Sequence, residues 1–139
     1  MPNTTIEKLE TVGREVRRRL YDPERILEVE DLDNYTRFTD YALGVMSTAI
    51  DKRGKQFQLT VAIEEMAELT KELTKVIRSG SYETNDNLEE EIADVLIMLQ
   101  QVCIILSTSD SNIWDVISAK INRLTERMDL DPWSEIEIK

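Results

Sequence analysis

Apolar residues recur at steps of three and four along most of the chain, which is the spacing of an amphipathic helix. Prolines occur only at positions 2, 23 and 132, so none of them interrupts a helix between residues 24 and 131. The pattern predicts a helix through residues 6–20, a short one through 26–29, and longer ones at about 35 or 39–50, 56–78, 88–106 and 113–128. Because helical spacing covers almost the whole chain, the expected fold class is all-α.

Turn signals separate the predicted helices. Gly54 and Gly80 are expected in the turns that end two of them. Asn87, with Glu90 three residues later, predicts a capped start for the helix that follows Gly80. The connections between the long helices are therefore short.

Four long helices with short connections favour a four-helix-bundle-like core. We expect this core to form one compact unit over residues 34–139, preceded by a helical extension at residues 1–33. Coiled-coil-like apolar seams are expected in 56–78 at Leu59, Ala62, Met66, Leu69, Leu73 and Val76. In 88–106 the apolar positions are Leu88, Ile92, Val95, Leu99, Val102 and Leu106.

The stretch from Val95 to Leu106 is apolar on nearly every side, broken only by two glutamines. A chain of this length cannot easily bury such a helix by itself. We therefore expect a homo-oligomer, either a homodimer or a homotetramer, in which a second copy covers one face of this helix.

Composition narrows the chemistry. The chain has 28 acidic and 17 basic residues, a net charge of −11, so general binding to nucleic acid is not expected. It has no histidine, which excludes an imidazole base, the common zinc sites and di-iron bundles. Cys103, the only cysteine, lies in an apolar run and fits a buried position in a reducing compartment. With no secretion signal and no membrane span, the chain is expected in the cytoplasm without a membrane partner.

Carboxylates are the side chains left for acid, base and metal-ligand roles. Glu65 and Glu68 are three residues apart on a predicted helix, as are Glu91 and Asp94, so each pair lies on one helix face. Two such pairs on facing helices would supply up to four oxygen ligands to Mg²⁺, which prefers them. An acidic protein that handles phosphates needs a cation of this kind.

The other interpretation is a solvated acidic face, which many surface helices carry. At about 100° per residue, Glu65 and Glu91 fall at the border of their apolar seams, where clustered negative charge is unfavourable without a cation. The glutamates expected to stay mostly solvated are Glu64, Glu72, Glu89 and Glu90. Spacing alone leaves both interpretations open.

A family resemblance links the two carboxylate pairs. Residues 64–68 (EEMAE) and 91–94 (EIAD) are similar to the EExxE and ExxD motifs of the MazG-like all-α nucleoside triphosphate pyrophosphohydrolases. That superfamily also includes the dimeric dUTPases and the dCTP pyrophosphatases. The resemblance covers roughly residues 40–128, and the two motifs in this order are more specific than either alone.

The resemblance implies an enzyme in which a metal-activated water hydrolyses a nucleoside triphosphate to a monophosphate and pyrophosphate. The implied ligands of Mg²⁺, or of Mn²⁺ in its place, are Glu65, Glu68, Glu91 and Asp94. Catalytic roles are implied for Glu64 and Glu65. Lys120 and Arg123, three residues apart on the last helix, match the family's KxxR pattern and are expected to bind the phosphates.

The sequence does not identify the base or the sugar of the substrate. Candidates for base binding are Gln56 and Phe57, followed by the aromatic residues Phe38, Tyr41, Trp114 and Trp133. Arg14 and the arginines at 17–19 are expected to be surface charge on the first helix, the alternative being a contact with phosphate or with a partner. The alternative function is a non-catalytic helical module that binds a nucleotide or a partner helix. Stabilisation of the fold by Mg²⁺ would separate the two.

Overall fold

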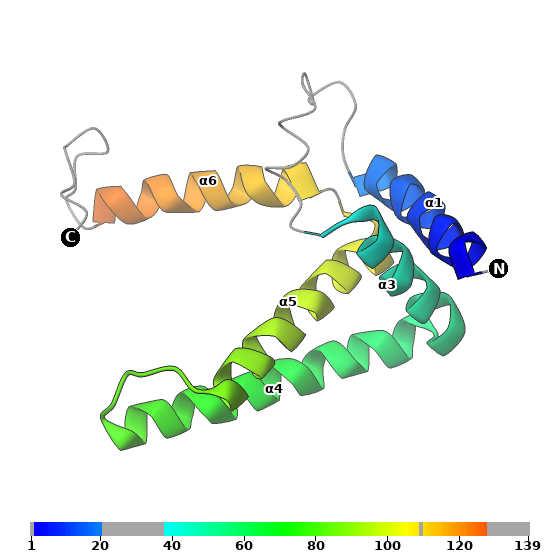
Figure 1. The fold of residues 1–139 in the computed structure, drawn as a ribbon. Coiled ribbons are helices and arrows are strands. Elements are labelled where there is room, and N and C mark those ends of the chain that lie inside the picture. The colour runs from blue at the N-terminus through cyan, green and yellow to red at the C-terminus, as the bar shows by residue number, and fades with distance from the viewer. Residues whose placement is uncertain (1, 21–37, 109, 128–139) are drawn as a thin grey trace.

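All regular secondary structure is helical in the part of the chain that the structure, a computed structural model, describes: residues 2–20, 38–108 and 110–127 (Figure 1). The helices are α1 (Pro2–Leu20), α3 (Asp40–Arg53), α4 (Lys55–Ser79), α5 (Asp86–Leu106) and α6 (Asp110–Arg127). The predicted all-α class is confirmed, and each longer predicted segment corresponds to one helix. The short helix predicted at 26–29 and the candidate Trp133 lie outside the described residues.

Local backbone geometry sets where the helices end. Gly54 between α3 and α4 has a φ of 95°, and Gly80 after α4 has a φ of 69°, values that favour glycine. At the start of α5, the side-chain oxygen of Asn85 accepts a hydrogen bond from the Leu88 backbone N–H at 2.9 Å. The prediction that Asn87 caps this helix is therefore wrong by two residues, because Asn85 has the extended backbone of a cap.

Helices α1 and α3 lie so close together that each presents a glycine to the backbone of the other. A Cβ added to Gly13 would lie 1.6 Å from the Asp40 carbonyl oxygen, and one added to Gly44 would lie 1.8 Å from the Leu9 carbonyl oxygen. Real Cβ atoms essentially never make contacts shorter than 3.0 Å. These two glycines therefore permit the spacing of the helix pair.

The buried core cluster lies where the α1–α3 pair meets the end of α5. Its members are Val16, Leu43 and Met46, with Phe38, Cys103 and Ile104 packed against them. Arg17 joins the two helices beside the cluster: its Nε donates to the Asp40 carboxylate at 2.7 Å and its Nη2 donates to the Phe38 carbonyl at 2.9 Å. The prediction of surface charge is therefore wrong for Arg17, which ties α1 to the start of α3.

Helices α4 and α5 form an antiparallel hairpin (Figure 1). Across it, Gln58 pairs with Gln101 through a hydrogen bond of 2.6 Å, and the Glu65 carboxylate lies within 4.8 Å of the Asp94 carboxylate. On both helices these pairs are seven residues apart, which is two turns or about 10.5 Å. The line where the two helices meet thus carries polar pairs at successive heptad positions.

This contact line matches the predicted apolar seams only in part: the seam residues Ala62, Leu88 and Val95 are buried, but others are exposed. On α4, Gln58 is buried, whereas the predicted seam residues Met66 and Leu73 are 41% and 46% exposed. On α5, the predicted seam residues Ile92 and Leu99 are 41% and 45% exposed. The residues of α5 that are buried are Leu88, Val95, Met98, Gln100, Gln101 and Ile105. Each helix therefore carries a second, apolar stripe that faces outward.

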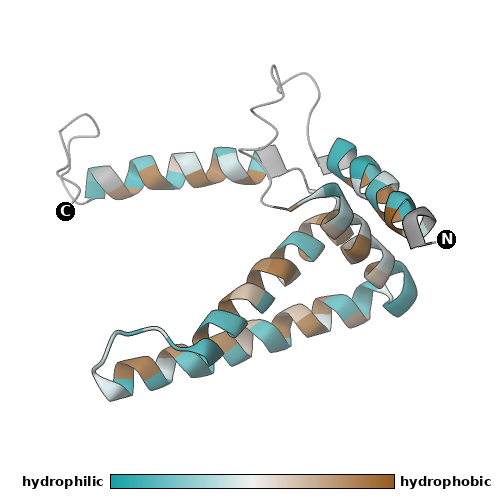
Figure 2. Cartoon of the chain, in the orientation of Figure 1, coloured by the Kyte–Doolittle hydropathy of each residue, from teal (hydrophilic) through white to brown (hydrophobic). Residues whose placement is uncertain are grey.

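Helix α6 runs away from the hairpin (Figure 1). Its apolar stripe is uncovered among the described residues. Ile113, Ile117, Ile121 and Leu124 are 37% to 53% exposed. Hydrophobic patches recur along α4, α5 and α6 (Figure 2). The described helices of one chain do not close into a single four-helix bundle, so that bundle stays a prediction for an assembly. None of the described helices has the length and apolar character needed to cross a membrane.

Candidate functional site

Three carboxylates converge on one side of the α4–α5 hairpin. Glu65 comes from α4, and Glu91 and Asp94 come from α5. Each contributes one oxygen to a group in which all of the oxygens lie within 4.8 Å of one another. Glu65 and Glu91 are half-buried, whereas Asp94 is exposed. We call these three residues the carboxylate triad.

The helical repeat and the register of the hairpin explain this convergence. Glu91 and Asp94 are three residues apart, so both project from the same side of α5. The antiparallel register places Glu65 opposite Asp94, so that oxygens of the two carboxylates lie within 4.8 Å of each other. The convergence of the triad therefore follows from helix periodicity and from the register of the hairpin.

Desolvation and repulsion raise the pKa of two triad members above the ordinary value of 4.5. For Glu65 the largest cause of the raised pKa is burial, followed by the charges of Asp94 and Glu91. For Glu91 the largest cause is again burial, followed by the charges of Asp94 and Glu68. Negative charge is thus gathered where water solvates it poorly, and either protons or a divalent cation would relieve it.

The triad fits a divalent metal ion. The Oε2 atom of Glu91 is buried and has no hydrogen-bond partner among the described residues. A buried carboxylate oxygen without a partner destabilises the fold, and a cation would satisfy it. Carboxylate oxygens are the donors that Mg²⁺ and Mn²⁺ prefer, and three of them leave coordination positions for water and phosphate oxygens.

Two other predicted glutamates lie near the triad without joining it. Glu68 is exposed one turn beyond Glu65, and its charge contributes to the raised pKa of Glu65 and Glu91. Its oxygens nevertheless lie outside the group of three. Glu64 is exposed, about 100° around α4 from Glu65. The structure therefore brings together three of the four predicted ligands, with the fourth close by.

Glu72 differs from its prediction. Its side chain is only 13% exposed and forms an ion pair with Lys75 at 2.9 Å. The predicted solvation of Glu72 is therefore wrong. Its charge also contributes to the raised pKa of Glu91. Glu89 and Glu90 are exposed, as predicted.

The predicted phosphate ligands Lys120 and Arg123 lie on α6, where both are exposed. The shallow hollow beside them is lined by residues of α6 alone: Lys120, Ile121, Arg123, Leu124 and Arg127. Because α6 runs away from the hairpin (Figure 1), one chain does not bring these basic side chains to the carboxylate triad.

The predicted base-binding residues Gln56 and Phe57 lie in the first turn of α4, and the Phe57 side chain is 54% exposed. Their neighbour Gln58, which is not among the predicted site residues, is 2% exposed and pairs with Gln101. Spacing could have revealed this pair. One glutamine lies seven residues before Glu65, and the other lies seven residues after Asp94.

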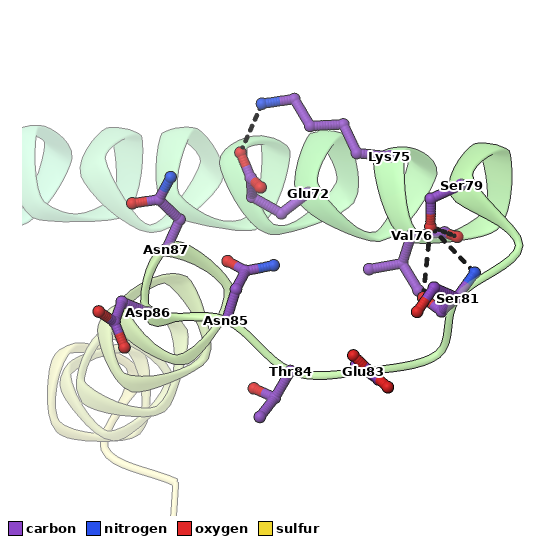
Figure 3. A pocket seen from close by; sticks show the side chains of 10 residues that line it. All are labelled: Glu72, Lys75, Val76, Ser79, Ser81, Glu83, Thr84, Asn85, Asp86 and Asn87. Atoms are coloured by element: carbon purple, nitrogen blue, oxygen red, sulfur yellow. Dashed lines mark hydrogen bonds and ion pairs between the residues drawn. The ribbon is translucent and has the colours of Figure 1, made fainter.

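A hollow at the far end of the hairpin is distinct from the triad (Figure 3). The residues that line it come from the end of α4, the connecting loop and the start of α5: Glu72, Lys75, Val76, Ser79, Ser81, Glu83, Thr84, Asn85, Asp86 and Asn87. None of the three triad residues is among these ten, so this hollow does not mark the candidate metal site.

Comparison with known families agrees with the geometry. The model of the MazG nucleotide pyrophosphohydrolase domain matches residues 53–129, which is more than half of the chain. No curated protein and no solved structure shows significant similarity to it. The matched range contains α4, α5 and α6, and with them the whole carboxylate triad. The resemblance drawn from the two carboxylate motifs is thereby confirmed, and the chain belongs to the MazG nucleotide pyrophosphohydrolase family.

Proposed function

We propose that the protein hydrolyses a nucleoside or deoxynucleoside triphosphate, in the presence of Mg²⁺, to a nucleoside monophosphate and pyrophosphate. The observation that carries this proposal is the carboxylate triad with the partnerless Oε2 atom of Glu91. Family membership supports a nucleotide as the substrate. The net charge of −11 adds a physical reason for the metal, because a triphosphate is repelled by this chain unless a cation lies between them.

Glu65, Glu91 and Asp94 are the proposed Mg²⁺ ligands, with Glu68 completing or orienting the set and Mn²⁺ as a substitute ion. When bound, the ion neutralises charge on the phosphates and lowers the pKa of water. The carboxylates gain from the same event. Binding a cation removes the repulsion that raises the pKa of Glu65 and Glu91.

In the proposed reaction, a water oxygen forms a bond to the α-phosphorus while the bond from that phosphorus to the bridging oxygen breaks. Pyrophosphate leaves with the bridging oxygen, and the water gives up a proton. Glu64 is exposed beside Glu65 and belongs to no ion pair that the structure describes. We assign it the role of orienting the water and accepting this proton.

Lys120 and Arg123 are the proposed phosphate ligands, and they can act only beside the triad. We propose that α6 of a second copy brings them there, since α6 of the same chain runs away from the hairpin (Figure 1). The uncovered apolar stripe of α6 and the outward stripes of α4 and α5 are suited to cover one another in a homodimer or homotetramer. The cytoplasm stays the proposed compartment, in keeping with the single, partly buried Cys103.

The test is an assay of the full-length chain with each standard and deaminated nucleotide, in which monophosphate and pyrophosphate are quantified separately. We expect the two products in equal amounts and complete loss of activity in EDTA. Glu65→Gln and Glu91→Gln should lower the activity by more than the roughly 10–100-fold typical of residues behind metal ligands.

Glu90→Gln is the matched control, because Glu90 is exposed next to Glu91 on the same helix and loses the same charge. This variant should keep the activity of the wild type. No turnover of any nucleotide with Mg²⁺ or Mn²⁺ would overturn the proposal.

A further inference from the structure

Two buried glutamines lie on the same helix contact line as the carboxylate triad. Gln58 of α4 is 2% exposed and Gln101 of α5 is 5% exposed. The Nε2 atom of Gln58 donates to Oε1 of Gln101 at 2.6 Å. The Nε2 atom of Gln101 donates a weaker hydrogen bond to the Sδ atom of Met98 at 3.5 Å. We call Gln58 and Gln101 the amide pair.

One polar atom of the amide pair lacks a hydrogen-bond partner. The Oε1 atom of Gln58 is buried and has no hydrogen-bond partner among the described residues. A buried acceptor without a partner destabilises the fold, and two apolar side chains of similar volume would join the helices without this cost. Helix packing alone therefore explains the pair poorly. The chemistry that its free oxygen requires is a hydrogen-bond donor from outside the hairpin.

The position of the amide pair relative to the triad suggests where that donor comes from. Gln58 precedes Glu65 by seven residues and Gln101 follows Asp94 by seven, so the pair and the triad are about 10.5 Å apart along the hairpin. A nucleotide with its α-phosphate at the triad carries its base on the far side of the sugar. Phe57, next to Gln58 and 54% exposed, adds a ring on which a base can stack.

We propose that the amide pair selects the base of the nucleotide, with the Oε1 atom of Gln58 accepting a hydrogen bond from an amino or ring N–H group on the edge of the base. This inference rests on the proposed hydrolysis and extends it to substrate selection. Gln101 is a positioning residue that holds the Gln58 amide in the required orientation. A glutamine amide suits base edges because it offers a donor and an acceptor side by side. Since Oε1 is covered in the chain alone, the base enters by displacing side chains above it.

The test compares the wild type with Gln58→Met and Gln101→Met, in which a side chain of similar length lacks the amide. Each enzyme is assayed with dATP and dITP, with dCTP and dUTP, and with a purine deoxynucleoside triphosphate that carries no amino or keto group. We expect the wild type to hydrolyse this last substrate with a kcat/KM lower by about tenfold or more than that of its best purine substrate. Both variants should lose this discrimination through KM, with kcat little changed. Each single variant leaves the other amide of the pair buried and unpaired, so its melting temperature should fall, whereas replacing both glutamines should leave the melting temperature unchanged or higher.

Gln100→Met is the matched control. Gln100 is buried on the same helix, but it lies about 100° around α5 from Gln101, on the side where Cys103 and Ile104 pack against the core cluster. This variant should keep the selectivity of the wild type. If Gln58→Met alone does not fold, the double variant Gln58→Met/Gln101→Met replaces it, since it leaves no unpaired amide in the contact line.

Three results would overturn a role in base selection. Unchanged discrimination in both variants, or a uniform fall of kcat/KM for every nucleotide, would reduce the amide pair to a structural hydrogen bond while the proposed hydrolysis stands. The same loss of discrimination in Gln100→Met would assign the effect to general loosening of α5. No turnover by the wild type is the separate result that overturns the proposed function and this inference with it.

Discussion

Gly44→Ala tests how closely the α1–α3 pair is held. The added Cβ would lie 1.8 Å from the Leu9 carbonyl oxygen, whereas real contacts essentially never fall below 3.0 Å, so the helices would have to part by at least 1.2 Å there. The obstacle is the backbone of α1, which has no alternative rotamer to adopt. Parting the helices would loosen the packing of Val16 against Leu43, which are 1% and 0% exposed in the core cluster.

Two effects of opposite sign determine how much Gly44→Ala changes the free energy of unfolding. Alanine in place of glycine inside a helix stabilises the fold by roughly 1 kcal/mol. Overpacking a rigid core costs about 1–3 kcal/mol, and a gap of about 0.5–1 Å forfeits a quarter to a half of each dispersion contact beside it. Because the required movement exceeds that gap, we expect a net loss of about 2 kcal/mol in the free energy of unfolding. For a chain of this size the melting temperature should fall by about 6 °C.

The measurement is thermal unfolding by circular dichroism at one fixed protein concentration. Val45→Ala is the control, because Val45 is the next residue on α3 and is 42% exposed, so its truncation should change the free energy of unfolding by less than about 0.5 kcal/mol. Gly13→Ala, which meets the Asp40 carbonyl from the other helix, should behave like Gly44→Ala. An unchanged or higher melting temperature for Gly44→Ala would refute the close approach of α1 and α3.

Four further predictions concern the triad and the assembly. Without divalent ions, the free energy of unfolding should fall as pH rises above the ordinary glutamate pKa of 4.5. The reason is that the pKa values of Glu65 and Glu91 are raised, so the native state binds more protons than the unfolded state in this pH range. Chemical unfolding at a series of pH values measures this dependence. Adding Mg²⁺, or the substitution Glu91→Gln, should make the dependence on pH weaker. If neither changes it, the triad is not its source. Glu68→Gln should raise the Mg²⁺ concentration for half-maximal activity by about tenfold, which is less than the increase expected for Glu91→Gln. Equal increases in the two variants would mean that Glu68 is itself a metal ligand. Leu99→Glu, on the outward stripe of α5, should dissociate the homo-oligomer in sedimentation velocity; a wild type that sediments as a monomer would rule out the proposed assembly. Mixing Glu65→Gln chains with Lys120→Ala/Arg123→Ala chains should restore part of the activity, and no restoration between two folded variants would exclude phosphate ligands from a second copy.

The existence of the helices could be predicted because their signals are local. The spacing predicted a helix over 56–78, and α4 spans Lys55–Ser79. The start of α5 was misplaced because Asn85 and Asn87 are both good caps, and a local pattern does not show which of them has the extended backbone.

The side of each helix that faces its neighbour could not be predicted in the same way. Hydrophobicity favours Met66 and Leu73 over Gln58 and Glu65 as contact residues, yet the structure exposes the first two and turns the second two toward α5. The reason is pairing. Each polar residue has its partner on α5, some 29 to 43 positions further along the chain. A match between two distant residues leaves no trace in the periodicity of either helix taken alone.

The candidate site was predictable as far as it depends on one hairpin. Glu65, Glu91 and Asp94 converge because a spacing of three residues and an antiparallel neighbour suffice to bring them together. The proposed placement of Lys120 beside them could not be derived from one chain. It would depend on where α6 packs, and therefore on whether a second copy covers its apolar stripe.

The hairpin divides stability and function between its two sides. An ordinary helix pair places its apolar residues between the helices, where their burial stabilises the pair. Here the contact line holds repelling carboxylates and a poorly satisfied amide pair, which weaken the hairpin by themselves. The outward stripes are exposed in one chain: Ile63 is 65% exposed and Leu99 is 45% exposed. They stabilise the fold only when another surface buries them, by about 1.5–3 kcal/mol for each large side chain. Assembly would therefore stabilise the fold and leave the inner line free for the polar groups that we propose as ligands of metal and base.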